Sequence, residues 1–151
     1  TVMSDITIYH NPRCSKSRQT LELIRGKGVE PEIVLYLEDV PAAEDIQDAL
    51  RMLGMRPMEL IRKTEAEFKE HFAGADELTD EQLIDLMRLY TKVIERPIVV
   101  NKGKAVIGRP PENVLGVLYG FGYQFLELMK CQPLIPSLGV FFYLCLLFII
   151  V

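Results

Sequence analysis

Apolar residues near the start of the chain follow the pattern of a strand, a helix and a second strand. Ile6–Tyr9 alternate apolar and mixed character in a β-branched run, which predicts a short strand that ends near His10. Good helix formers fill Ser15–Lys27, and Gly28 is a typical helix stop. Glu32–Leu37 form a near-continuous apolar run, typical of a strand that is buried on both faces. Two strands joined by a helix predict a right-handed βαβ unit with parallel strands.

The middle of the chain has the apolar spacing of helices. Apolar positions at i, i+3, i+4 and i+7 within Ile46–Leu53 predict one helix, which Gly54 closes. A second helical stretch is predicted from about Pro57 into Lys63, and a third reaches Phe72. Thr79–Gln82 form a capping box ahead of another apolar helical face. We therefore expect a helical block in the middle of the domain.

The remaining pattern predicts a hairpin followed by a helix. Pro97–Asn101 and Ala105–Ile107 are apolar runs joined by Lys102–Lys104, which indicates two strands and a tight connection. A further helix is predicted at about Glu112–Leu118, because prolines precede it and suit a first helical turn. The predicted order is β-α-β, a helical block, then β-β-α, an α/β arrangement with a mixed sheet.

Length and composition fit one cored domain followed by an apolar tail. A chain of 151 residues, 49% of them hydrophobic and 25% charged, suits one core rather than two. We assign residues 1–118 to the domain, with an insertion at about 42–92, and residues 119–151 to the tail. Residues 132–151 carry no charge and, at about 1.5 Å per helical residue, are long enough to span a bilayer. Prolines interrupt that segment, so a membrane anchor, a packed segment and a non-native readthrough sequence all stay open.

Charge and cysteine content exclude several classes of protein. A net charge of -4 argues against sequence-independent nucleic-acid binding, which needs a positive surface. The three cysteines, Cys14, Cys131 and Cys145, are odd in number and widely spaced, which favours neither a disulfide framework nor a metal site. The chain does not start with a basic region followed by an apolar stretch. We therefore expect a cytoplasmic protein with reduced thiols and no metal.

Cys14 stands where the predicted first helix begins, directly after a strand end. A cysteine is a nucleophile only as a thiolate, and a free thiol with a pKa of about 8.5 is mostly protonated at neutral pH. The helix N-terminus stabilises an anion there, and Arg13, Lys16 and Arg18 add positive charge. This pattern predicts a reactive thiolate. The alternative is a small buried cysteine with basic neighbours.

Two nearby polar residues, His10 and Ser17, are candidate supports for that thiolate. Protonated His10 would favour the anion or relay protons, and its alternative is a half-exposed histidine at a strand end. The Ser17 hydroxyl is a candidate donor to the sulfur or to a bound oxyanion. A Cys-x5-Arg phosphatase loop would need arginine at Thr20, and a Cys-x-x-Cys redox motif would need cysteine at Ser17. Both classes are therefore disfavoured.

Three arginines lie at the ends of predicted elements. Arg62 comes late in a predicted helix, Arg96 precedes the Pro97–Asn101 strand, and Arg109 follows the hairpin. Taken singly, each suits a solvated surface charge. If the strands form one sheet, Arg96 and Arg109 converge with Cys14 at one edge, and paired guanidinium donors would create an oxyanion pocket.

With these residues identified, the chain resembles the glutaredoxin-dependent arsenate reductase family. Four motifs carry the resemblance in the expected order: HNPRCSKSRQTL, LIRK around Arg62, ERPIVV around Arg96, and IGRPPENVL around Arg109. The resemblance covers about Ile6 to Leu118 and does not extend to the apolar tail. Arg13 and the Ser-Lys pair that flank the cysteine resemble a short-chain branch of the family.

The resemblance implies a thioredoxin-like fold with a helical insertion and a single catalytic cysteine. It makes Cys14 the nucleophile, makes Arg62, Arg96 and Arg109 the oxyanion ligands, and makes Pro97 a candidate cis-proline. In the family, the thiolate attacks arsenate, glutathione displaces the product to give a mixed disulfide, and glutaredoxin regenerates the thiol. No bound cofactor is implied, because glutathione is a co-substrate.

Two other functions fit the same residues. A general glutathione-linked thiol oxidoreductase would use the same cysteine on mixed disulfides. A redox-responsive interaction protein without arsenate activity would resemble thioredoxin-like regulators. Such sensors usually have a second cysteine three residues after the first, where this chain has Ser17.

Overall fold

A four-stranded mixed sheet lies at the centre of the described part of the protein. The computed structural model describes residues 5–119. The strands follow the order β2-β1-β3-β4, in which β1 pairs parallel to β2 and antiparallel to β3, and β3 pairs antiparallel to β4. Their bounds are β1 Ile6–Tyr9, β2 Glu32–Val34, β3 Ile98–Asn101 and β4 Lys104–Ile107. The predicted α/β fold with a mixed sheet is confirmed.

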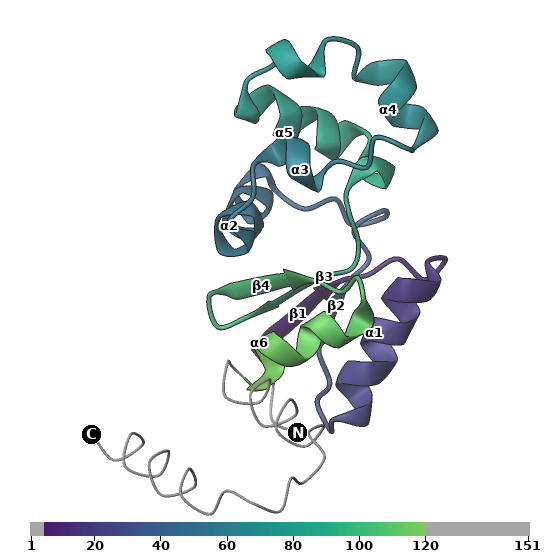
Figure 1. Cartoon of the computed structure of the whole chain (residues 1–151), viewed down its shortest axis with the longest axis vertical. Helices are drawn as coiled ribbons and strands as arrows, with labels where there is room; N and C mark the ends of the chain where they lie inside the picture. Colours follow the sequence, from purple (N-terminus) through teal and green to yellow (C-terminus); the bar gives the residue numbers. More distant parts are fainter. Residues whose placement is uncertain (1–4, 120–151) are drawn as a thin grey trace, which may run out of the picture.

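Each face of the sheet packs against its own layer of helices (Figure 1). Because side chains alternate along a strand, Ile8 and Val99 face one layer while Ile98 faces the other. The first layer holds the helices α1 (Ser15–Gly26) and α6 (Leu115–Tyr119), with a short 3-10 turn, η3 (Pro111–Val114), before α6. Its buried core comprises Ile6, Ile8, Leu21, Ile24, Val99 and Val114.

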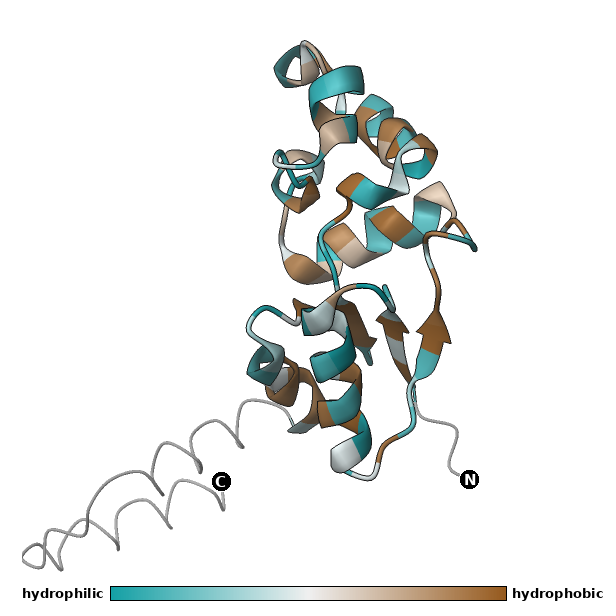
Figure 2. Ribbon diagram, turned by 90° about the vertical axis from the view of Figure 1, so that its right-hand side faces the viewer, coloured by the Kyte–Doolittle hydropathy of each residue, from teal (hydrophilic) through white to brown (hydrophobic). Residues whose placement is uncertain are grey.

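The opposite layer is the helical block, formed by four helices and two 3-10 turns. The helices are α2 Ala43–Leu53, α3 Pro57–Leu60, α4 Ala66–His71 and α5 Asp80–Leu89, and the turns are η1 Ala75–Glu77 and η2 Thr91–Val93. Hydrophobic and hydrophilic residues alternate along these helices, as Figure 2 shows, so that each has an apolar face for the core. That larger core includes Ile46, Leu50, Leu60, Phe72, Leu83, Ile84, Met87, Val93 and Ile98.

Several local predictions agree with the structure in detail. Cys14 is the N-cap residue of α1, and Gly54 closes α2 in the left-handed conformation with φ 67°. The capping box is present, since Gln82 N–H donates to Thr79 Oγ1 at 3.3 Å and Thr79 N–H donates to Gln82 Oε1 at 3.0 Å. The hairpin turn contains only Lys102 and Gly103, whose φ values of 48° and 76° suit a tight two-residue connection.

The prediction of a doubly buried strand over Glu32–Leu37 is wrong. β2 ends at Val34 and is an edge strand with Ile33 exposed. The chain then turns, since the Leu35 carbonyl accepts hydrogen bonds from the N–H groups of Glu38 and Asp39. The second half of the apolar run belongs to a different core, in which Tyr36 is 1% exposed.

The predicted helix from Pro57 into Lys63 is also too long. α3 ends at Leu60, and Ile61 instead forms an isolated antiparallel bridge with Ile94. Backbone hydrogen bonds flank that bridge, from Arg62 N–H to Val93 O at 2.7 Å and from Glu95 N–H to Leu60 O at 2.9 Å. Arg62 therefore lies just beyond a strand-like segment rather than late in a helix.

The Arg96–Pro97 peptide bond is cis, as the family resemblance implied. A second cis bond, Arg109–Pro110, was not predicted. Within residues 5–119, none of the helices has the length and apolar character needed to cross a membrane. The tail segment 132–151, like Cys131 and Cys145, lies outside the described residues.

Candidate active site

Cys14 lies between the end of β1 and the first turn of α1. Its backbone is extended, with φ −92° and ψ 120°, and its carbonyl accepts the hydrogen bond from Arg18 N–H at 3.0 Å. The preceding turn is held by a bond from Cys14 N–H to Asn11 O at 3.0 Å. The sulfur therefore sits at a helix N-terminus, where unpaired backbone N–H groups favour an anion.

The thiol is surrounded by groups that favour its ionised form. Burial raises the pKa of Cys14, but the backbone N–H of Ser17, the charge of Arg109, the backbone N–H of Lys16 and the charge of Arg96 outweigh that effect. The pKa of Cys14 is therefore below that of a free thiol. Arg109 Nη2 lies 3.3 Å from the sulfur and donates to it. A partly buried thiolate beside a guanidinium is a competent nucleophile.

His10 and Ser17 support the site differently from the sequence prediction. His10 Nδ1 lies 2.7 Å from Ser17 Oγ, and Asn11 N–H donates to the same oxygen at 3.0 Å. Burial, followed by the charges of Arg25 and Arg18, lowers the pKa of His10. The lowered pKa favours neutral histidine and so disfavours the cationic role, while a proton relay stays a prediction. His10 is buried rather than half-exposed, against the alternative considered for it. The buried Ser17 hydroxyl is engaged by His10 and Asn11, so it is the backbone N–H of Ser17 that serves the sulfur.

Arg96 and Arg109 come together beside Cys14, as predicted for strands of one sheet. Arg96 lies two residues before β3 and Arg109 two residues after β4, and Arg109 Nε donates to the Arg96 carbonyl at 2.8 Å. Arg62 joins them through shared carboxylates rather than by direct contact with the sulfur. The three predicted arginines therefore form one cluster in the structure.

Two glutamates that the sequence analysis did not select connect this cluster. Glu65 Oε1 lies 2.7 Å from Arg62 Nη1 and 3.2 Å from Arg96 Nη2. Glu95 Oε1 lies 3.1 Å from Arg109 Nε, and its Oε2 lies 3.8 Å from Arg62 Nε. Their proximity in sequence to Arg62 and Arg96 was the available signal. Acidic residues beside basic ones are common on solvated surfaces, so that signal was weak.

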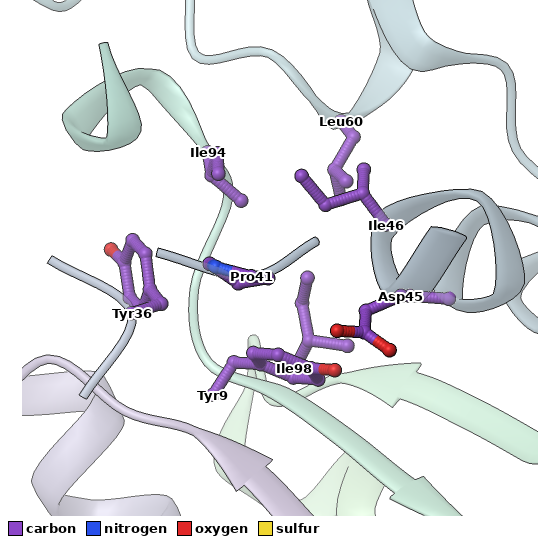
Figure 3. A pocket seen from close by; sticks show the side chains of 9 residues that line it. Tyr9, Tyr36, Pro41, Asp45, Ile46, Leu60, Ile94 and Ile98 are labelled. Carbon is purple, nitrogen blue, oxygen red and sulfur yellow. The ribbon is translucent and has the colours of Figure 1, made fainter. Parts of the chain in front are cut away.

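Two buried donor atoms beside the cluster have no hydrogen-bond partner within the part of the chain that the structure describes, Tyr36 Oη and Arg96 Nε. The pKa of Tyr36 is raised, and burial is the main cause. The charge of Arg96, the Asn11 side chain and the charge of Arg62 act to lower it, and the charge of Cys14 acts to raise it. Figure 3 shows the Tyr36 ring at one side of an apolar cavity, with its hydroxyl directed away from that cavity. The hydroxyl therefore belongs to the polar site. Buried polar atoms of this kind call for a functional explanation.

Gly108 brings the elements of the site into close contact. A Cβ atom at this position would lie 2.6 Å from Thr20 Oγ1 and 2.8 Å from Pro97 Cγ. Thr20, on α1, also approaches the Gly108 carbonyl at 3.3 Å. The helix that carries Cys14, the cis-proline and the residue before Arg109 therefore meet where only glycine fits.

Nothing in the described region suggests a metal centre. Within residues 5–119, no group of three or more histidine, cysteine, aspartate or glutamate side chains is placed to hold a metal ion. The site itself brings together the Cys14 thiol and the Arg109 guanidinium, 3.3 Å apart.

Comparison with known proteins gives consistent matches. Residues 9–117 match the model of the ArsC family. The chain is 52% identical over 114 residues to the uncharacterized protein YfgD of Escherichia coli K12, covering 75% of this chain and 96% of that protein. It is 43% identical over 116 residues to an Escherichia coli arsenate reductase, covering 77% of this chain and 82% of that enzyme. The solved structure of an arsenate reductase from Vibrio cholerae superimposes with a TM-score of 0.73 at 42% identity, covering 78% of this chain and 99% of the other.

Proposed function

Since the chain belongs to the ArsC family, we propose that it is an oxidoreductase that reduces arsenate to arsenite through Cys14. The observation that carries the proposal is the Arg109 guanidinium 3.3 Å from the Cys14 sulfur, at the start of a helix. This arrangement provides a nucleophile and a cation for an oxyanion at the same point. The relatives named arsenate reductase, at 42–43% identity, support arsenate as the substrate.

Arg62, Arg96 and Arg109 are the proposed oxyanion ligands. Guanidinium groups present paired N–H donors whose geometry suits tetrahedral oxyanions. The unpartnered donors Arg96 Nε and Tyr36 Oη add hydrogen bonds that a bound oxygen atom would satisfy. The pocket would hold the arsenic atom within reach of the thiolate, and such positioning supplies much of the rate in reactions of this kind.

The proposed reaction uses two thiols in addition to Cys14. The Cys14 thiolate bonds to arsenic(V), and one arsenate oxygen leaves as water after protonation. Glutathione then attacks the Cys14 sulfur and forms an S–S bond, while the electron pair of the S–As bond stays on arsenic, which leaves as arsenite. A glutaredoxin thiolate attacks the glutathione sulfur of this mixed disulfide and releases the Cys14 thiolate. Two thiols are oxidised and one arsenic is reduced by two electrons.

External thiols are proposed because the site carries a single cysteine. Ser17 stands where a dithiol enzyme would place its second sulfur, and its side chain holds His10 and Asn11. Cys14 therefore has no second cysteine within residues 5–119 with which to form a disulfide. A supply of reduced glutathione implies the cytoplasm as the compartment of this reaction.

The test is arsenate-dependent NADPH consumption in the presence of glutathione, glutaredoxin and glutathione reductase. Cys14→Ser should lower the rate by at least about 1000-fold, because no thiolate remains to bond to arsenic. The matched control is Cys131→Ser with Cys145→Ser, which should keep the wild-type rate. Equal rates for the wild type and Cys14→Ser would contradict the proposal.

A glutathione-linked thiol oxidoreductase is the second candidate. A single cysteine beside the buried Ser17 suits this second function as well as it suits arsenate reduction, since a monothiol site also acts on mixed disulfides. Replacing arsenate by a glutathione mixed disulfide in the same assay separates the two. Turnover of the disulfide without turnover of arsenate would assign the second function.

A further inference from the structure

Two carboxylates contact the three guanidinium groups of the arginine cluster. Glu65 lies within 3.2 Å of both Arg62 and Arg96, and Glu95 lies 3.1 Å from Arg109. The Glu65 and Glu95 side chains are only 23% and 24% exposed, so they are parts of the arginine cluster rather than solvated surface charges. The N–H of Arg96 also donates to Glu95 Oε1 at 3.1 Å, which orients that carboxylate.

These carboxylates change the kind of anion that the pocket accepts. Three guanidinium cations face two carboxylates and the Cys14 thiolate, so the charges of the site are nearly balanced before an oxyanion enters. A carboxylate only accepts hydrogen bonds. An unprotonated oxyanion oxygen beside it is repelled, whereas a hydroxyl of the oxyanion donates to it.

We propose that Glu65 and Glu95 make the oxyanion pocket selective for oxyanions that still carry a proton. Arginines bind the unprotonated oxygens, and the two glutamates accept hydrogen bonds from the protonated ones. The inference rests on the proposed function, because it assigns specificity to the same pocket. Arsenate and phosphate keep at least one hydroxyl near neutral pH, while sulfate keeps none.

The charged groups that face the two glutamates come from several elements of the fold. Glu65, at the start of α4, faces Arg62 from the connection between α3 and α4, and both Arg96 and Lys92 from the segment before β3. Glu95 faces Arg62 and, across the site, Arg109 after β4. Two other titratable groups face the same arginines: Cys14, whose pKa the charges of Arg109 and Arg96 lower, and Tyr36, whose pKa the charges of Arg96 and Arg62 lower against the effect of burial.

The experiment measures how phosphate and sulfate protect Cys14 from alkylation in the full chain, with Cys131 and Cys145 changed to serine. Each anion is titrated at about pH 6 and about pH 8, where phosphate changes its protonation but sulfate does not. The ratio of the two half-protecting concentrations cancels the titration of the thiol itself. Activity is not needed, so the measurement stands apart from turnover.

In the wild type, phosphate should protect at concentrations about ten- to hundredfold lower than sulfate, and the ratio should shrink as the pH rises. Glu65→Gln with Glu95→Gln removes both charges but keeps the shape, and should bring the two anions within about threefold of each other. Glu67→Gln is the matched control, because it removes a charge from the same helix that pairs with Lys92 and not with the arginines. The control should keep the wild-type ratio.

The outcomes separate this inference from the proposed function. If no oxyanion protects Cys14 in any variant, the pocket itself is wrong and the proposed function fails with it. If phosphate protects the wild type but sulfate protects equally well, or if the double variant keeps the full preference, only the inference is overturned. The pH series on the chain with Cys131 and Cys145 changed to serine needs no substitution of either glutamate. It therefore tests the inference even if the double glutamate variant does not fold.

Discussion

The sheet with α1 and the helical block contribute to the site in different ways. The sheet layer places Cys14 at a helix start and Arg109 against its sulfur, and Arg96 enters directly before β3. The helical block supplies Arg62 and Glu65, which contact the arginine cluster but not the sulfur. Arg62 and Glu65 are therefore the residues through which the proposed oxyanion binding can be changed without changing activation of the thiol, whereas Arg96 and Arg109 contribute to both.

The same division appears in the packing. The sheet layer has a small core around Ile8, Ile24 and Val99, whereas the helical block has a larger one around Leu60 and Met87. Neighbouring residues of β3 belong to different cores, because Ile98 packs in the core of the helical block and Val99 in the core of the sheet layer. β3 therefore contacts both layers. Substitution of Arg62 in the helical block should change the proposed oxyanion binding and leave the pKa of Cys14, whereas substitution of Arg109 should change both.

Met87→Ala should give the largest effect on stability. Met87 is fully buried in α5, and its loss leaves a cavity that should lower the free energy of unfolding by about 2–5 kcal/mol. Urea unfolding measures this change. Leu89→Ala on the same helix is the control, because Leu89 is 74% exposed and should change stability by less than about 0.5 kcal/mol. Below the unfolding transition, the alkylation rate of Cys14 in Met87→Ala should match the wild type. A slower rate would show that the two layers are not separable.

Arg109→Gln should affect both properties, because this arginine touches the thiol and the carboxylate cluster. Removing its charge raises the pKa of Cys14, so the pH midpoint of alkylation moves upward and the rate at neutral pH falls by about tenfold, after allowance for partial exposure of the pair. Oxyanion protection should weaken in the same variant.

The sign of the pH effect on stability follows from the same lowered pKa. Ionisation of Cys14 stabilises the folded wild type above the pKa of a free thiol, and this contribution is lost as the pH falls through the folded pKa. Arg109→Gln should reduce that part of the pH dependence, which urea titrations across the pH range measure. An unchanged alkylation midpoint would remove Arg109 from thiol activation.

Arg62→Gln should affect oxyanion binding alone. Arg62 contacts Glu65 and Glu95, and it is not among the groups that shift the pKa of Cys14. The concentration of arsenate needed to protect Cys14 should rise by about fivefold, while the alkylation midpoint stays where it is. A moved midpoint would mean that the helical block also activates the thiol, against the division described above.

Tyr36→Phe should give the smallest effect. Its hydroxyl is buried without a partner among the described residues, so its removal should not lower the free energy of unfolding. If the hydroxyl donates to the bound oxyanion, arsenate protection should weaken by about threefold. Thermal unfolding measures the stability, and the rate of Cys14 alkylation at increasing arsenate concentrations measures the protection. Unchanged protection would restrict Tyr36 to packing.

The sequence predicted the strands and helices that carry a strong local pattern. β1 and the hairpin have clean apolar runs, and α1, α2 and α5 have caps and helical spacing, so all five were found. The prediction for Glu32–Leu37 failed because its apolar residues lie in two different surroundings. Ile33 is exposed on an edge strand, while Tyr36 fills the core of the helical block. A local pattern cannot show that one run divides between two surroundings.

The candidate site was predictable where residue type alone limits the chemistry. A cysteine at a helix start and arginines at strand ends have few roles, so Cys14, Arg96 and Arg109 were identified before their convergence was known. Glu65, Glu95 and Tyr36 were missed because their roles depend on partners distant in sequence. The choice between the roles considered for His10 was left open for a related reason, since the burial that lowers its pKa is a property of the folded chain.

The bridge between Ile61 and Ile94 also bears on where the chain tolerates a change of length. It joins the two ends of the segment from α4 to η2, with Arg62 one residue after Ile61 and Arg96 two residues after Ile94. Within that segment α5 is fixed by its buried residues Leu83, Ile84 and Met87. The connection between α4 and α5 is exposed at Gly74, Asp76 and Glu77, and a longer surface loop costs little once its ends are fixed. We expect insertions at this connection to leave the fold and the geometry around the thiol unchanged.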